Sequence, residues 1–219
     1  MFVGHYAAAF ALKGREKEAS LGWLFIATQF VDILFFPFVV WGLETMEFVP
    51  GYTETNDFKM EFPFTHSLIG SILWAIAFGG IFFLLFGRKK TSGKSIAFVL
   101  GLGVLSHWVA DLFVHTPDLP LLHGEPKFGF GLWHNKAATF ALEALVLLLG
   151  LWYYLKRTVA KNKFGKFVSI GFVLFLLLVN YLNYYVLPAN HDIIGLTISA
   201  LVSYFLFAGL AFWVDTKRT

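Results

Sequence analysis

Two ionisable side chains lie one helical turn apart inside an apolar segment that is long enough to cross a bilayer. His107 and Asp111 both belong to the segment Ser95–Val114, and residues four apart share one helix face, about 6 Å apart along the axis. Placing either group in hydrocarbon is costly unless it is paired, neutral or bound to a cation. Ionisable side chains in such a segment are therefore candidates for function.

Other apolar segments carry ionisable side chains at a similar depth. At a rise of about 1.5 Å per residue, Asp32 and His107 are expected about 18 Å, and Glu143 about 20 Å, from the cytoplasmic ends of their helices. Helix bundles assemble metal sites from facing side chains, and imidazole nitrogen with carboxylate oxygen suits zinc, manganese or ferrous iron. The sequence predicts one of these divalent metals, held by His5, Asp32, His66, His107 and Asp111.

Three further residues are candidates for acid–base chemistry beside that site. Glu143 is a lone carboxylate in an apolar helix, and His115 continues the helix face of His107 and Asp111. Asp118 follows His115 in a loop that contains two prolines. We expect Glu143, or the pair His115 and Asp118, to orient a metal ligand or to transfer protons. The structural alternative is that the buried polar groups only hold helices together by hydrogen bonds.

Composition indicates a polytopic helical membrane protein. Of the 219 residues, 58% are hydrophobic and only 14% are charged, whereas soluble domains carry about a quarter charged residues. Six apolar stretches reach the length of about 20 residues that a hydrocarbon core requires. These predicted transmembrane helices are Leu21–Leu43, Ser67–Phe86, Ser95–Val114, Ala137–Leu155, Phe164–Leu187 and Ile193–Val214. We therefore expect an all-α transmembrane bundle.

The whole chain, 1–219, is predicted to form a single transmembrane domain. Within it, 1–19 would form a short N-terminal helix and a cytoplasmic turn, 20–155 the helices that carry the motifs, and 156–219 two C-terminal helices. The segment Phe2–Leu12 is too short to span, and basic residues follow it rather than precede it, which argues against a signal peptide. We predict that it dips into the inner half of the bilayer; the alternative is an amphipathic helix on the membrane surface.

Basic residues predict the orientation of the bundle. Most of the seventeen Lys and Arg residues fall on alternate loops, which the positive-inside rule places in the cytoplasm. Both flanks of the six-span core would then face the cytoplasm, in the inner membrane of a prokaryote. These membrane anchors account for the net charge of +3, so we expect no nucleic-acid partner.

Several short motifs follow one another in a distinctive order: Gly4-His5, Asp32 in the first long helix, Thr65-His66-Ser67, and Ser106-His107 with Asp111 four residues later. Their order resembles the YdjM-like family of LexA-binding, inner-membrane-associated, metal-dependent hydrolases, and this resemblance makes zinc the first choice of metal. Val114–Pro120, and Gly131–Trp133 followed by Glu143, are similar to one bacterial subgroup. The resemblance covers about 1–155, and it implies a helical fold in which His5, Asp32, His66, His107 and Asp111 converge as metal ligands.

Together these patterns favour a membrane-embedded, metal-dependent hydrolase. The expected partner is a membrane lipid or another amphiphilic ester or phosphoester, which would be cleaved by a water activated at the metal. The alternative is a proton- or ion-coupled transporter that uses the same buried histidines and carboxylates as a relay. A third interpretation is a membrane scaffold without catalytic function.

Overall fold

The computed structural model describes the whole chain, residues 1–219, and it is built almost entirely from helices. The all-α class predicted from the sequence is confirmed, apart from two short hairpins. The elements in chain order are the 3-10 turn η1 (Val3–His5), α1 (Tyr6–Arg15), α2 (Leu21–Thr28), α3 (Phe30–Val40), β1 (Thr45–Phe48), β2 (Phe58–Glu61), α4 (Leu68–Phe82), the π turn η2 (Phe83–Gly87), α5 (Gly93–Val114), β3 (Leu119–Pro120), β4 (Lys127–Phe128), the 3-10 turn η3 (Leu132–His134), α6 (Lys136–Arg157), α7 (Lys163–Tyr185) and α8 (Ile193–Asp215).

Five helices are long and apolar enough to cross a membrane, or six if the bent pair α2 and α3 forms one span. The five are α5, α6, α7, α8, and α4 together with the turn that continues it to Gly87. Large apolar side chains cover their outer surfaces; Leu73 on α4 is 61% exposed and Phe205 on α8 is 52% exposed. An apolar surface this extensive is typical of a protein surrounded by lipid.

The sequence predicted one continuous helix over Leu21–Leu43, but the structure divides it at Gln29. The axes of α2 and α3 differ by 46°. The break leaves the carbonyl of Thr28 outside the helical hydrogen-bond pattern, and this oxygen lies 2.8 Å from Nδ1 of His107. Irregular backbone inside a bundle is tolerated where other groups satisfy it. The bend therefore ties the first span to a histidine of α5.

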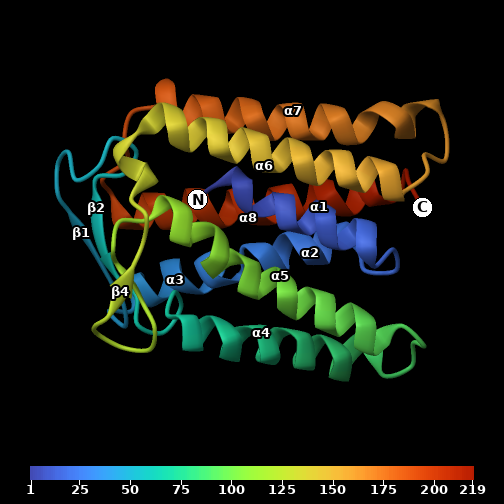
Figure 1. The fold of residues 1–219 in the computed structure, drawn as a ribbon, viewed down its shortest axis with the longest axis horizontal. Helices are drawn as coiled ribbons and strands as arrows, with labels where there is room; N and C mark the ends of the chain where they lie inside the picture. The colour runs from blue at the N-terminus through green and yellow to red at the C-terminus, as the bar shows by residue number, and fades with distance from the viewer.

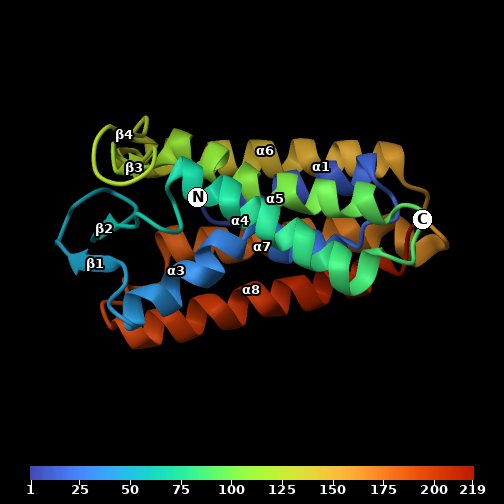
Figure 2. The same ribbon diagram turned by 90° about the horizontal axis from the view of Figure 1, so that it is seen from below.

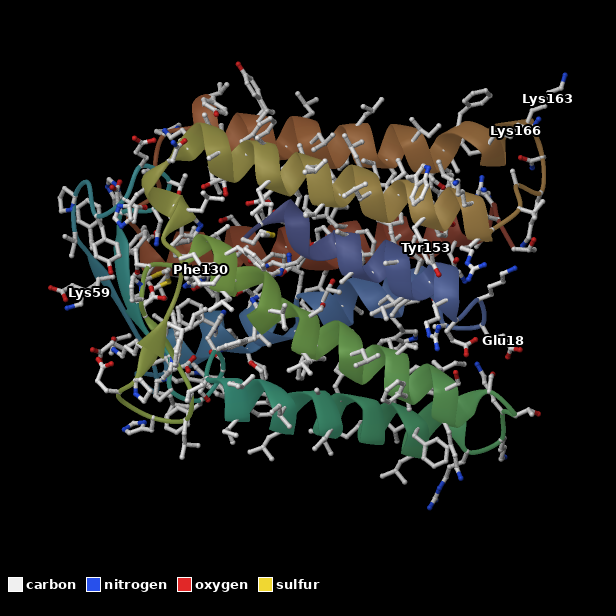
Figure 3. All side chains as sticks on the ribbon, in the orientation of Figure 1. Glu18, Lys59, Phe130, Tyr153, Lys163 and Lys166 are labelled. Atoms are coloured by element: carbon white, nitrogen blue, oxygen red, sulfur yellow. The ribbon has the colours of Figure 1, made fainter.

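The helices run along the long axis of the molecule, and both hairpins lie at one end of it (Figure 1). In each hairpin the strands are antiparallel, β1 with β2 and β3 with β4. The view turned by 90° places the C-terminus at the opposite end (Figure 2). We call these the hairpin end and the C-terminal end. Figure 3 labels Glu18, Lys163 and Lys166 at the C-terminal end and Lys59 at the hairpin end.

The short helix α1 lies within the bundle, between α5 and α6 in the view of Figure 1. Tyr6, Ala9 and Phe10 are completely buried. At the C-terminal end of α1, Nζ of Lys13 lies 2.8 Å from Oδ1 of Asp215 on α8. Helix α1 is thus held among the long helices, which does not fit the alternative of a helix on the membrane surface.

Two buried apolar clusters surround the polar residues of α5. The larger includes Phe10, Leu100 and Val104 and fills the interior of the bundle, and the smaller includes Phe62 and Trp133 and lies under the loops of the hairpin end. His107 and Asp111 follow Val104 on α5 and lie where the two clusters meet. The candidate ligands are therefore enclosed by apolar side chains rather than by solvent.

A glycine allows α1 to approach α6. A Cβ atom at Gly150 would lie 2.5 Å from the carbonyl oxygen of Ala7, whereas nothing lies within 4 Å of a Cβ at Gly171 on α7. Small residues permit this close approach between membrane helices.

We predict that Gly150→Ala lowers the midpoint of thermal unfolding in detergent, whereas Gly171→Ala leaves it unchanged or raises it. Alanine is the better helix former by about 1 kcal/mol, but at Gly150 the overpacking costs about 1–3 kcal/mol. Unfolding midpoints measured on the two variants side by side test this difference. Equal stabilisation of both variants would show that α1 does not pack against α6 in this way.

Candidate metal centre

The carboxylate of Asp111 is the centre of a buried cluster of imidazoles. Its Oδ2 lies 3.0 Å from Nε2 of His107, 3.6 Å from Nε2 of His115 and 3.8 Å from Nε2 of His66. Its Oδ1 lies 3.2 Å from Nε2 of His5 and 2.6 Å from the amino nitrogen of Met1. Asp111 itself is 1% exposed. Four histidines thus direct Nε2 at one carboxylate, two of them from α5 itself and two from distant segments.

Asp32 on α3 supplies a second carboxylate next to the same imidazoles. Its Oδ1 lies 3.2 Å from Nε2 of His66 and 3.5 Å from Nε2 of His107. The hydroxyl of Tyr204 on α8 donates a hydrogen bond of 3.1 Å to Oδ2 of Asp32. Because the break at Gln29 precedes Asp32, the first turn of α3 can bring this carboxylate to the histidines.

All five residues predicted as metal ligands lie in this cluster. Two groups of three could hold an ion, His5, Asp32 and His107, and His66, His107 and Asp111, with ligand atoms within 4.8 Å of one another. Ligand atoms about 2.1 Å from one zinc ion are at most about 4.2 Å apart, so a small contraction would close either group around a metal. The two groups share His107, which is completely buried.

The Nδ1 atoms of three histidines are engaged, which leaves Nε2 free to bind a ligand. Nδ1 of His107 donates to the carbonyl of Thr28, and Nδ1 of His115 lies 2.9 Å from Oδ1 of Asp118. Nδ1 of His5 is buried without any partner, and Nε2 of His5 and Nε2 of His107 face Asp111 at 3.2 and 3.0 Å without the alignment of a hydrogen bond. Buried polar atoms without partners are rare in folded proteins. Metal-binding histidines commonly donate their other ring N–H to a carbonyl or a carboxylate, as here.

Nδ1 of His66 is fixed through a hydroxyl and a carboxylate. The Thr65 hydroxyl donates to Oε2 of Glu44 at 2.8 Å, so it is free to accept from Nδ1 of His66, which lies 2.8 Å away. Oε1 of Glu44 also accepts the backbone N–H groups of Phe64 and Thr65. Glu44 is not predictable from the sequence, because it is one of several acidic residues between two predicted spans and its spacing does not distinguish it from the others.

The acid–base candidates His115 and Asp118 adjoin the cluster. The hydroxyl of Thr116 donates to Oδ2 of Asp118 at 2.9 Å, while Oδ1 faces His115. The ring of Trp133 lies 3.9 Å from that of His115, centroid to centroid. Asp118 thus orients His115, and Nε2 of His115 faces Asp111, where it could bind a metal or carry a proton.

Glu143, the third acid–base candidate, contacts the N-terminal segment instead of the imidazoles. Its carboxylate accepts the backbone N–H groups of Phe2 and Gly4 and the hydroxyl of Tyr184. The ring of His5, next to Gly4, stacks on that of His107 with centroids 3.8 Å apart. These contacts give Glu143 the geometry of a residue that positions His5; its predicted role in proton transfer stays a prediction.

Comparisons with protein-family models, with curated proteins and with solved structures found no match. The resemblance to the YdjM-like family therefore rests on the motifs alone.

We predict that Glu143→Ala loosens the N-terminal segment. Because the chain contains no cysteine, Val3→Cys creates a single probe at a completely buried position. Loss of a carboxylate that accepts three donors leaves buried N–H groups unpaired, at a cost of about 1–3 kcal/mol each. A thiol reagent should therefore label Cys at position 3 faster in the Glu143→Ala background. Equal labelling rates in both backgrounds would contradict this role.

Proposed function

We propose that the chain is a membrane-embedded, metal-dependent hydrolase that acts on a lipid or another amphiphilic ester. The observation that carries this proposal is the convergence of four histidine Nε2 atoms on Asp111, with Nδ1 of three of them engaged by a carbonyl, a hydroxyl or a carboxylate. In a cluster that only joined helices, we would expect the buried ring nitrogens to be hydrogen-bonded. Here Nδ1 of His5 has no partner, and Nε2 of His5 and Nε2 of His107 face Asp111 without forming a well-aligned hydrogen bond.

The donor set fits a divalent cation of the zinc type. Neutral imidazole nitrogens and carboxylate oxygens are the ligands that zinc takes in catalytic sites. We assign His5, Asp32, His66, His107 and Asp111 as the residues that would hold one or two ions. A bound dication would polarise a scissile carbonyl or phosphoryl group and lower the pKa of a water molecule. It would also balance the charge of the two buried carboxylates.

The surrounding residues supply the positioning and the proton transfer. Asp118 holds His115 with Nε2 directed at the cluster, so His115 can accept a proton from water and return it to a leaving group. Tyr204 holds Asp32 in place from α8. The loop Glu44–Thr65 and Trp133 cover the cluster at the hairpin end and would exclude bulk water.

We further propose that the C-terminal end, with Lys163 and Lys166, faces the cytoplasm of a prokaryotic cell. The chain would then lie in the inner membrane with both flanks of a six-span core inside. α1 would extend from the cytoplasmic end into the bilayer, and the metal cluster would lie nearer the outer surface. The resemblance to the YdjM-like family supports the same assignment of the site.

A proton- or ion-coupled transporter is the alternative that uses the same groups. It requires access to the cluster from both sides of the membrane. Between the cluster and the C-terminal end, however, Leu100, Val104 and Phe10 are completely buried in apolar packing. This arrangement favours chemistry at one side over passage through the bundle.

Metal content tests the proposal. The protein purified without chelator should contain stoichiometric zinc or another divalent metal, and His107→Ala and Asp111→Asn should lose it. His123→Ala, in an exposed loop, is the control and should retain the metal. A wild-type protein without metal, even after incubation with zinc, would refute the metal centre. Metal content unaffected by both site variants would place the ion elsewhere.

The contact between Thr65 and His66 predicts that metal affinity depends on the hydroxyl at position 65. Thr65→Val keeps the shape of the side chain but removes the hydroxyl that links His66 to Glu44. Loss of such an outer contact lowers metal affinity by about 10–100-fold, whereas Thr65→Ser keeps the hydroxyl and should remain close to wild type. Zinc titration against a competing chelator measures both affinities. Equal weakening by Val and Ser would show that packing, not the hydrogen bond, sets the affinity.

A further inference from the structure

Two cavities of different character reach residues that contact Asp111. The first, of about 440 Å³, lies between α1, α5 and α6 and is lined mainly by apolar side chains, among them Ala8, Leu105, Val109, Ala110 and Phe113. The second, of about 500 Å³, lies at the hairpin end and has a mixed lining: apolar side chains make up about half of it, and its polar groups include Thr55, Asn56, Asn183 and Asn190. We call it the polar cavity. Both volumes fall in the range of ligand-binding cavities, about 300–1,000 Å³.

The apolar groove opens on the outer surface of the bundle. Val109 is 50% exposed and Phe113 is 46% exposed, and both lie on the face of α5 that borders the groove. Figure 1 shows the ribbon of α1 between those of α5 and α6. In a bilayer, this opening lies among the lipid chains, so its occupant would enter sideways rather than from water.

The inner end of the groove distinguishes it from an ordinary lipid contact. His5 lines the groove, is buried, and has no hydrogen-bond partner at either ring nitrogen. The same ring stacks on His107 and directs Nε2 at Asp111. The groove therefore leads from the lipid-facing surface to an unpaired polar group of the metal cluster. A third cavity, between α4 and α5, is also apolar but has no such end.

Met1 lines both the groove and the polar cavity, and its amino nitrogen lies 2.6 Å from Oδ1 of Asp111. The charged side chains of the polar cavity are those of Glu54, Asp57 and Lys136, two acidic and one basic, and the amino group of Met1 is paired with Asp111. The carboxylate of Glu54 accepts a hydrogen bond from the backbone N–H of Lys136. The lining therefore offers hydrogen bonds from amides and hydroxyls and carries no excess of positive charge for an anion.

We propose that the substrate is an amphiphile that lies across the metal cluster. This inference rests on the proposed function. Its alkyl chain occupies the groove between α1, α5 and α6, its uncharged, hydrogen-bonding head group occupies the polar cavity, and its ester lies between them beside Asp111. We place the alkyl chain and the head group in this way because the groove is lined mainly by apolar side chains, whereas the polar cavity also offers amide and hydroxyl groups.

A monoacylglycerol with a photoreactive group near the end of its chain tests the groove. With the full-length protein in nanodiscs, cross-links should concentrate on Ala8, Val109 and Val146, which line the groove. Ala8→Phe on α1 and Ala110→Phe on α5 should each lower cross-linking on the order of tenfold, because a bulky side chain overfills the space. Val202→Phe on the exposed face of α8 is the control and should have no effect.

Zinc content measured on the same variants separates this inference from the proposed function. Groove labelling that is lost in both filled variants, with zinc retained, supports the proposal. Labelling that is spread over all lipid-facing helices and is unaffected by the filled variants would overturn it while the metal centre stands. Groove labelling in a protein that never binds zinc would instead refute the hydrolase and leave a lipid-binding groove.

Competition tests the head group. Unlabelled monoacylglycerol should displace the probe better than an acyl lipid of equal chain length with an anionic phosphoglycerol head group. Equal or stronger competition by the anionic lipid would overturn the assignment of the polar cavity.

Discussion

A carboxylate buried among apolar helices needs polar partners, and at Asp111 these are four imidazoles and the amino group of Met1. An unpaired charge in this position would be prohibitive in a bundle surrounded by lipid. His107 and His115 come from the same helix as Asp111, whereas His5 comes from the N-terminal turn and His66 from the loop just before α4. Much of the architecture at the hairpin end serves to bring these side chains to one point.

Several local irregularities follow from that requirement. The first span breaks at Gln29, which presents the carbonyl of Thr28 to His107 and turns Asp32 toward the cluster. The loop before α4 folds back so that Glu44 can hold the backbone and hydroxyl of Thr65. In each case a backbone or side-chain hydrogen bond fixes the orientation of a ring rather than adding a ligand. The ligands and their supports thus form one connected network.

The sequence predicted the five central residues because residue type and depth in an apolar helix are sufficient to mark a buried His or Asp as exceptional. It did not predict the supports. Glu44 is one of several acids in a predicted loop, and its contact with Thr65 depends on how that loop folds. No glycine or proline lies next to Gln29, so the sequence contains no signal for the break. Glu143 was predicted as a functional residue from its depth alone, and its contacts with the backbone of Phe2 and Gly4 were not predicted. The positions of the helices can be predicted from local composition, whereas the contacts of Glu44 and Glu143 depend on tertiary packing.

The most direct test of the account is X-ray absorption spectroscopy at the zinc edge on the zinc-loaded protein. We predict nitrogen and oxygen ligands at about 2.0–2.2 Å, with the outer-shell scattering of at least two imidazole rings, and we predict that His107→Ala retains no zinc that gives this spectrum. A spectrum with oxygen ligands only, or an unchanged spectrum from zinc bound to His107→Ala, would contradict the claim that these histidines and carboxylates gather around a common cation.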